Sequence, residues 1–280
     1  MFIYPHKLIL KTCGTTTLLL GLEKILSISK SLCNLNSIFQ VFYSRKTFMF
    51  PERQRGPHKD WLDEVKFLDK FFENGNAYNV GKVNGDHWLL YMSSNEQQLP
   101  IRNHSFTTPP DITLELLMTN LDLDSCKLFY YPQISKDDEI SCHKAGKSIS
   151  DELGISSLFK NISLDAFLFQ PCGYSSNAIW LDENDHDKYF TIHVTPEHEI
   201  SYASFETNAN FNNSQELNEL IKKVIEIFKP GKLTSTLFVS LDDHQQQNNK
   251  IKPPNEFNSN LFDNYNRVDR INYEFPGYER

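Results

Sequence analysis

Apolar residues recur along the first half of the chain at spacings that predict alternating strands and helices. The opening stretch MFIYPHKLILKTCG is strand-like and ends at Cys13 and Gly14, where a turn is expected. A helix is predicted over 15–30, a strand over 37–48, a loop over 50–60, a helix from Asp60 to about Phe72 and a hairpin over 77–92. Asn84 and Gly85 predict a tight hairpin turn, because both residue types tolerate positive φ.

The second half continues this alternation. PPDITLELLMTNL (109–121) predicts a helix capped by Asp111, and the polar stretch 133–151 predicts a loop. SLDAFLFQPCGYSSNAIW predicts a strand that runs into a Cys-Gly turn, and KYFTIHVTPEHEISYASFETN predicts a hairpin. Residues 214–229 predict an amphipathic helix with Ser214 as its N-cap, and the polar stretch 242–260 predicts a mobile loop.

Hairpins and helices in succession predict antiparallel sheets with helices packed on their outer faces, which is an α+β layered architecture. The two halves, roughly 1–130 and 155–280, share one plan: a strand, a Cys-Gly turn, a hairpin and an amphipathic helix. We therefore expect a single domain over 1–280, and an internal duplication is one explanation of the shared plan.

Composition excludes several classes of protein. Of 280 residues, 39% are apolar and 21 are Phe, which is enough material for a sizeable core and argues against disorder. The net charge is −8 and the Lys and Arg residues are scattered, so nucleic acid is not an expected partner. An acidic surface also argues against binding to anionic membranes.

The five cysteines are widely spaced and form no CxxC pair, so a zinc cluster is not expected. Reduced thiols are typical of cytosolic proteins. No apolar run approaches the roughly 20 residues that span a bilayer. Lys11, Thr12 and Gly14 interrupt the apolar run that a signal peptide needs. We therefore expect a cytoplasmic protein without a metal site or a membrane segment.

A few residues suggest chemistry by their type and position. Cys13 and Cys172 each precede a glycine just after a strand, where a cysteine is either a small core residue or a thiol that acts as acid, base or nucleophile. His193 faces away from its apolar strand neighbours, and such a histidine is commonly only hydrogen-bonded. Glu206 lies in an apolar strand, where an unpaired carboxylate would be costly. A cofactor-free cysteine enzyme stays open here, although no Cys–His–acid spacing supports it.

Three further acids have ordinary explanations. Asp111 and Glu115 are four residues apart in a predicted helix and so share a face, where capping and solvation are the default roles. Glu197 follows a predicted hairpin turn and would by default be solvated. Spacing alone therefore names no function.

Several stretches, taken together, resemble eukaryotic, fungal-type S-adenosylmethionine decarboxylases. They are LILKTCGTTTLL, FYSRKTFMFP, PDITLELLM, FQPCGYSSNA, YFTIHVTPEHEISYASFETN and VIEIFKPGKLTSTLFV. They occur in the family's order over most of residues 1–241, and NYNRVDRINYEF (264–275) resembles the tail of fungal and plant forms.

The resemblance implies a four-layer α/β/β/α sandwich of two antiparallel sheets flanked by helices. It implies decarboxylation of S-adenosylmethionine, which supplies the aminopropyl donor for spermidine and spermine. The family uses a covalent pyruvoyl group, which forms a Schiff base with the substrate and accepts electrons. This group arises when a proenzyme cleaves itself at a serine. The small N-terminal chain is therefore an expected partner, and a homodimer is one assembly that the resemblance allows.

The resemblance also implies roles for single residues. Cys13 matches the proton-donating cysteine, and Ser175 and His193 match residues that assist self-cleavage. Phe169 matches an aromatic ring that stacks on the adenine, and Glu197 matches the carboxylate that binds the ribose hydroxyls.

A second group of residues matches the binding site for putrescine, a diamine that activates some members. These residues are Asp111, Thr113, Glu115 and Glu206, with Lys11 nearby in the family's pattern. Acids placed around a diamine make electrostatic sense, because each buried charge would otherwise be unpaired.

The chain departs from the family at one point. The family's cleavage-site serine lies in a Glu-Ser-Ser stretch just before the residue that matches Met1. We therefore expect this chain to lack that stretch, together with the first strands and helix of one sheet, and to be inactive alone. Three explanations are a truncated gene model, a processed large chain without its small partner, and a short non-catalytic paralogue that binds polyamines or regulates a full-length partner.

Overall fold

The computed structural model describes residues 1–94, 112–132, 139–184, 186–211, 213–239 and 265–273. The chain divides into two compact units, Met1–Thr108 with Asp269–Gly277, and Pro109–Val268 with Tyr278–Arg280. The predicted mobile loop 242–260 lies outside the described residues. None of the helices in the described part of the chain combines the length and the apolar character needed to cross a bilayer.

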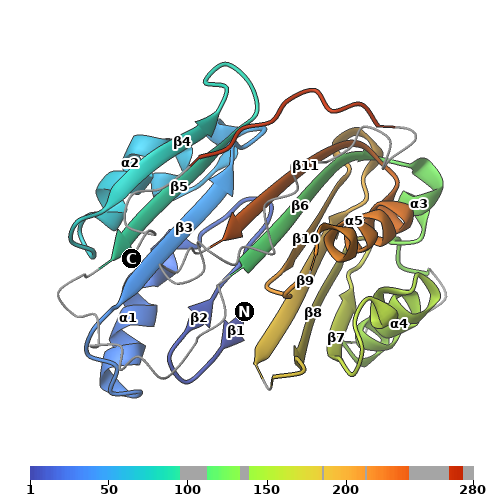
Figure 1. The fold of residues 1–280 in the computed structure, drawn as a ribbon, viewed down its shortest axis with the longest axis horizontal. Coiled ribbons are helices and arrows are strands. Elements are labelled where there is room, and N and C mark those ends of the chain that lie inside the picture. Colours follow the sequence, from blue (N-terminus) through green and yellow to red (C-terminus); the bar gives the residue numbers. More distant parts are fainter. Residues whose placement is uncertain (95–111, 133–138, 185, 212, 240–264, 274–280) are drawn as a thin grey trace. The chain divides into compact units, whose positions relative to one another are not determined.

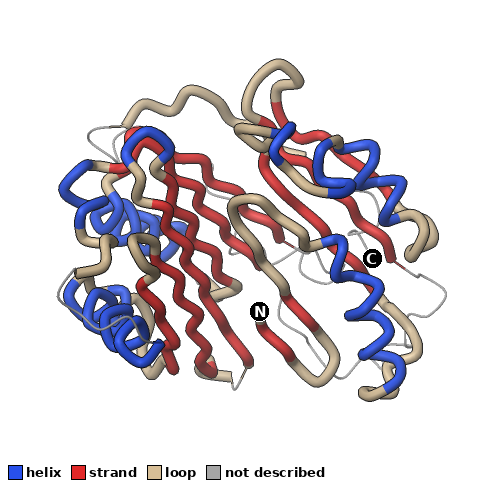
Figure 2. The backbone as a smooth tube through the Cα atoms, turned by 180° about the vertical axis from the view of Figure 1, so that it is seen from behind, coloured by secondary structure: helices blue, strands red, loops and turns tan. Residues whose placement is uncertain are grey.

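The first unit contains a two-stranded and a three-stranded sheet (Figures 1 and 2). Its elements in chain order are β1 (Phe2–Ile3), β2 (Leu8–Ile9), the short 3-10 helix η1 (Leu19–Gly21), α1 (Leu22–Ser31), β3 (Gln40–Lys46), η2 (Pro51–Arg53), η3 (Gly56–Lys59), α2 (Trp61–Leu68), β4 (Asn76–Gly81) and β5 (His87–Ser94). β1 pairs with β2, and the larger sheet has the order β3-β5-β4 with antiparallel pairing throughout. Leu19, Leu68, Phe72 and Tyr91 form its buried core.

The second unit contains a six-stranded antiparallel sheet in the order β11-β6-β10-β9-β8-β7 (Figure 1). Its elements are β6 (Ile112–Leu121), α3 (Leu123–Lys127), α4 (Glu139–Glu152), η5 (Ile155–Ser157), β7 (Ser163–Leu168), β8 (Tyr174–Leu181), β9 (Asp187–Thr195), η6 (His198–Ile200), β10 (Tyr202–Thr207), α5 (Ser214–Phe228) and β11 (Pro230–Val239). The predicted α+β class with antiparallel sheets is confirmed.

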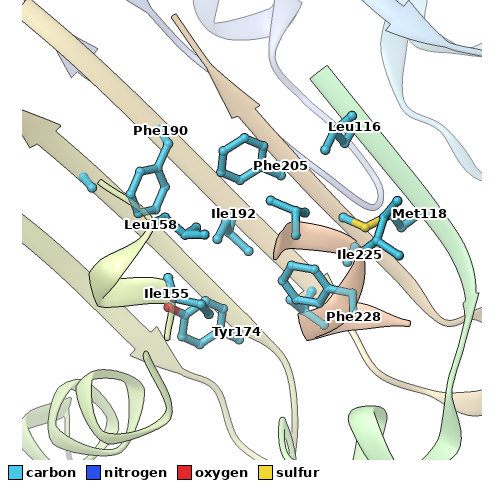
Figure 3. Close-up of a cluster of buried hydrophobic side chains, with 14 of the residues drawn as sticks. Leu116, Met118, Ile155, Leu158, Tyr174, Phe190, Ile192, Phe205, Ile225 and Phe228 are labelled. Atoms are coloured by element: carbon cyan, nitrogen blue, oxygen red, sulfur yellow. The ribbon is translucent and has the colours of Figure 1, made fainter. Parts of the chain in front are cut away.

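Alternation along the strands of this sheet separates an apolar face from a polar face. Figure 3 shows Phe190, Ile192 and Phe205 of the sheet packed with Ile225 and Phe228 of α5. All five belong to the main buried cluster, and burying each such side chain contributes about 1.5–3 kcal/mol. Successive strand residues point to opposite faces. The residues between these apolar ones therefore lie on the face that α5 does not cover.

The helix predicted over 109–121 is wrong, because residues 112–121 form strand β6. Ile112, Leu114 and Leu116 are buried on the helix-covered face, and Thr113 and Glu115 alternate with them. Strand pairing with β10 on one side and β11 on the other overrides the helix propensity of Leu, Glu and Met. The idea that Asp111 and Glu115 share a helix face fails with it, and Asp111 lies outside the described residues.

The loop predicted over 133–151 is also wrong where α4 begins at Glu139. This helix looks polar in sequence because most of the residues that it packs against the core are small, namely Cys142, Ala145 and Gly146, with Ile149 beside them. A Cβ atom on Gly146 would lie 2.6 Å from the backbone nitrogen of Phe167, so only glycine lets α4 lie this close to β7.

Two local predictions differ in detail. Asn84 and Gly85 do not adopt positive φ, and the β4–β5 connection spans residues 82–86, with the Gly85 N–H donating to the Lys82 carbonyl at 3.2 Å. The N-cap of α5 is Asn213, whose side-chain oxygen accepts from the Glu216 N–H at 3.0 Å, and Ser214 is the first helical residue.

Candidate functional site

The polar face of the six-stranded sheet carries a serine and a histidine in contact. Ser175 on β8 and His193 on β9 are directly opposite in the antiparallel register. The Ser175 Oγ atom lies 2.9 Å from His193 Nδ1, which is hydrogen-bonding distance. Both residues are half-buried, so the pair is shielded by the sheet yet within reach of a ligand. A hydroxyl and an imidazole so placed can exchange a proton.

A second polar pair lies one step along the same two strands. Asn177 on β8 faces Thr191 on β9, and the Thr191 hydroxyl donates to Asn177 Oδ1 at 3.0 Å. Thr191 Oγ1 also lies 3.4 Å from His193 Nε2. Thr191 is 1% exposed, so water has almost no access to these contacts.

The row that contains Thr191 continues across the sheet through two acids. Glu206 on β10 is opposite Thr191 on one side and Glu115 of β6 on the other, and Glu115 is opposite Thr236 of β11. Tyr189 donates its hydroxyl to Glu206 Oε1 at 2.8 Å. The side chains of directly opposite strand residues lie close together, and like charges so placed repel. Glu115, which is buried, and Glu206 therefore bring two carboxyl groups side by side on this face.

Two further residues predicted for diamine binding, Thr113 and Lys11, lie in different units. Thr113 lies two residues before Glu115 on the same strand face and is opposite Phe238 of β11. Lys11 belongs to the first unit.

The predicted substrate residues lie near one end of the sheet, where β7 ends, β8 begins and β9 ends. Phe169 is 44% exposed as a residue, and the centroid of its ring lies 4.7 Å from that of the Phe167 ring. The Phe169 N–H donates to the carbonyl of Gly173, whose φ of 111° suits glycine. Burial raises the pKa of the Cys172 thiol, and the charge of Glu197 and a hydrogen bond with it raise it further. Glu197 thus lies beside the Cys-Gly turn that carries Phe169.

Cys13 lies in a turn of the first unit that is closed by side chains. Gly14 has a φ of 72°, and the hydroxyls of Thr12 and Thr16 lie 2.7 Å apart. Cys13 as a residue is exposed, yet partial burial of its sulfur raises the pKa of the thiol, and the charge of Lys11 lowers it by less. The thiol is therefore protonated at neutral pH and can donate a proton.

Two buried side chains anchor this turn from about 40 residues away. Gln54 accepts from the Thr16 N–H at 3.0 Å and donates to the Gly14 carbonyl at 3.4 Å. His58 accepts from the Leu19 N–H through Nε2 at 3.1 Å, which places the imidazole proton on Nδ1.

The proton on His58 Nδ1 points to Glu64, whose Oε1 atom lies 2.8 Å away, and both side chains are fully buried. Arg45 donates through Nε to both oxygens of the same carboxylate, at 3.0 and 2.8 Å, and Tyr43 donates its hydroxyl at 2.8 Å. The turn thus rests on a buried ionic network.

Sequence reasoning missed several of these residues. Tyr189 and Thr191 carry a readable signal, because polar residues alternate with apolar ones through KYFTIHVT and therefore share a face with His193. Gln54 and His58 carry no such signal, because nothing local shows that they return to the Cys13 turn. Within the described part of the chain, no group of three His, Cys, Asp or Glu side chains could hold a metal ion.

Comparison with known proteins gives a consistent result. The sequence model of the family described as adenosylmethionine decarboxylase matches residues 1–280. The S-adenosylmethionine decarboxylase proenzyme of Xenopus laevis is 37% identical over 279 residues, which cover 99% of this chain and 74% of the relative. The Saccharomyces cerevisiae proenzyme is 33% identical, covering 99% and 75%, and the Onchocerca volvulus proenzyme is 42% identical, covering 86% and 60%.

The chain therefore spans between about three fifths and three quarters of the length of these relatives. Among solved structures, the Trypanosoma brucei AdoMetDC-delta26 monomer superposes with a TM-score of 0.67 at 24% identity, covering 99% of this chain and 94% of that one, which shows a shared fold. On the family match over its whole length and on its similarity to these relatives, the chain belongs to the adenosylmethionine decarboxylase family.

Proposed function

We propose that this protein removes the carboxyl group of S-adenosylmethionine, and so supplies the aminopropyl donor for spermidine and spermine. The observation that carries the proposal is the Ser175–His193 hydrogen bond on the polar face of the sheet, in a chain of this family. It supplies the proton-transferring pair that self-cleavage of a proenzyme needs.

The polar face fits the formation of a pyruvoyl group in its chemistry. Making this group from a serine requires the removal of a proton, and His193, which is hydrogen-bonded to Ser175, supplies a proton acceptor on this face. When bound, the pyruvoyl group supplies a carbonyl that withdraws electrons from the substrate's Cα. We propose a serine as its precursor, as the family pattern implies.

Different side chains of this chain transfer protons in self-cleavage and in decarboxylation. His193 Nδ1 accepts the proton that self-cleavage removes from the reacting serine, and the Ser175 hydroxyl is hydrogen-bonded to this nitrogen. Cys13 donates a proton to the substrate's Cα, a role that suits a thiol kept protonated by its raised pKa.

Substrate binding falls to the end of the sheet. The exposed Phe169 ring stacks on the adenine, and the Glu197 carboxylate accepts hydrogen bonds from the ribose hydroxyls. A sulfonium cation near an aromatic face gains on the order of 1 kcal/mol or more once it is desolvated.

Putrescine is the diamine that we assign to the acidic row. Glu115 and Glu206 are directly opposite each other and accept hydrogen bonds from the ammonium groups, and Thr113 lies on the same strand face. The family pattern adds Asp111, which lies outside the described residues, and Lys11, which belongs to the first unit. The same row supports a second candidate function, in which a non-catalytic paralogue binds polyamines and regulates a full-length partner. Neighbouring acids bind a diamine whether or not the chain catalyses.

The test uses the full-length gene product and two measurements: release of labelled CO₂ from carboxyl-labelled S-adenosylmethionine, and self-cleavage on a denaturing gel. We expect both in the wild type, and an uncleaved, inactive protein in His193→Ala. The matched control is His186→Ala, a partly exposed turn histidine, which should behave as wild type. Normal cleavage and turnover in His193→Ala would contradict the proposal.

Titration of the protein with putrescine distinguishes the regulatory paralogue from the enzyme. Binding of putrescine that Glu206→Gln abolishes, with no CO₂ release from the wild type under any condition, would favour the regulatory paralogue. Stimulation of CO₂ release that is lost in Glu206→Gln would favour the enzyme.

A further inference from the structure

Four side chains on two adjacent strands form one continuous set of hydrogen-bonding contacts. Ser175 contacts His193, His193 contacts Thr191, and Thr191 contacts Asn177, at 2.9, 3.4 and 3.0 Å. The pairs Ser175–His193 and Asn177–Thr191 are each directly opposite in the β8–β9 register, where the two strands lie side by side (Figure 1).

The direction of each hydrogen bond follows from the number of protons available. Thr191 has one hydroxyl proton and donates it to Asn177 Oδ1. Its oxygen can then only accept toward His193 Nε2, which must carry the ring proton of the neutral imidazole. His193 Nδ1 is left with its lone pair, and the Ser175 hydroxyl must donate to it.

We propose that Thr191 and Asn177 are positioning residues that hold His193 in the Nε2–H tautomer and so aim the basic Nδ1 atom at Ser175. A consequence is that the lone pair of His193 Nδ1 accepts the proton in self-cleavage, and only this consequence rests on the proposed function. The tautomer itself follows from the contacts.

The opposite tautomer would cost the hydrogen bond between Thr191 and Asn177. With a proton on Nδ1, the Thr191 oxygen could not accept from Nε2, and Thr191 could keep its contact with the ring only by turning its hydroxyl proton away from Asn177 Oδ1. Thr191 is 1% exposed, so water could not readily supply the missing hydrogen bond. Ser175 would become an acceptor and could no longer pass a proton to the ring.

The direct test is NMR of protein labelled with ¹⁵N-histidine, at a pH where His193 is neutral. Long-range ¹H–¹⁵N correlations distinguish a protonated from an unprotonated ring nitrogen, and His193→Gln assigns the signal by its absence. We expect a protonated Nε2 and an unprotonated Nδ1 in the wild-type chain. A protonated Nδ1 would overturn the proposal without any variant being needed.

Two variants then separate positioning from general structure. Thr191→Val keeps the shape but removes the hydroxyl, and we expect the His193 signals to shift toward a mixture of tautomers. Thr191→Ser keeps the hydroxyl and should restore the wild-type pattern. Unchanged tautomer signals in folded Thr191→Val would overturn the proposal.

Self-cleavage of the full-length protein tests the consequence separately. We expect Thr191→Val to slow cleavage about tenfold or more, because a misplaced proton removes the general base in part of the population. Thr191→Ser should cleave at close to the wild-type rate. A mixed tautomer with normal cleavage would support the positioning role and overturn the assignment of His193 as the proton acceptor in processing.

Discussion

The Cys13 turn of the first unit and the Ser175–His193 pair of the second unit hold their reactive groups in place by different means. Ser175 and His193 are opposite each other because β8 and β9 are in register, so backbone pairing over the whole strands sets their distance. Cys13 lies outside any strand. Its turn is held by the side chains of Gln54 and His58, which come from about 40 residues later in the chain.

This difference determines how strongly a single substitution changes the geometry of each site. A one-residue slip in a strand would move a whole apolar face out of the core, so register is strongly specified. A turn held by a few side chains depends on each of them, because a buried donor or acceptor that loses its partner is costly. We therefore expect single substitutions to disturb the Cys13 turn while the Ser175–His193 pair keeps its geometry.

The largest expected effect comes from Glu64→Ala. This change leaves the buried His58 and the mostly buried Arg45 without their shared carboxylate, and we expect the free energy of unfolding of the first unit to fall by about 3–5 kcal/mol. Urea unfolding, monitored by hydrogen exchange in each unit, measures this free energy. The matched control is Asp63→Ala on the same helix, whose exposed pair with Lys66 is worth about 0–1 kcal/mol. Equal unfolding midpoints for the two variants would contradict the buried network.

A smaller effect is expected from Gln54→Ala, which removes the acceptor of the buried Thr16 N–H. An unsatisfied buried group costs about 1–3 kcal/mol, so amide exchange at Thr16 should accelerate roughly tenfold or more. Amide exchange at Ser175 and His193 should not change in Gln54→Ala. The control is Glu52→Ala, a change of an exposed neighbour, which should leave exchange at Thr16 unaltered. Faster exchange at Ser175 and His193 in Gln54→Ala would mean that the two sites are not held independently.

The smallest expected effect is electrostatic and comes from Lys11→Ala. The thiolate is the reactive form of cysteine, and the charge of Lys11 lowers the pKa of Cys13 while burial raises it. Removing Lys11 therefore raises this pKa and slows alkylation of Cys13 at pH values below the pKa. We expect the rate to fall by less than about fivefold, because a charge effect near the surface is worth up to about 1 kcal/mol. Peptide-resolved mass spectrometry over a pH series measures the rate, with Lys24→Ala as the control. Faster alkylation in Lys11→Ala would show that its charge does not act on the thiol as described.

Local patterns predicted the elements well where one signal dominated. The hairpin of β9 and β10 follows from period-two alternation, and the apolar stripe of α5, including Leu217, Ile221 and Phe228, is buried as its spacing predicts. The strand β6 was missed because Leu, Glu and Met favour helices, and only pairing with two neighbouring strands overrules that preference.

The candidate site divides in the same way. The motifs around Cys13, Phe169, Ser175, His193 and Glu197 indicate the family and its chemistry, and the family match over residues 1–280 confirms the family. The roles of those residues stay proposals. No motif predicted that Thr191 contacts both His193 and Asn177. The contact with Asn177 depends on the register of β8 and β9, which places these two residues opposite each other.

The sequence by itself determined the alternation of apolar and polar positions, the chemistry of the side chains and the family, because each is a property of residues close together in the chain or of motifs in a set order. The tertiary structure alone decided which polar residues meet. Glu206 faces Glu115 across 91 positions only because β10 and β6 pair, and Gln54 reaches Thr16 only because η2 folds back on the turn. Contacts of this kind depend on the packing of the whole unit, which no local stretch of sequence encodes.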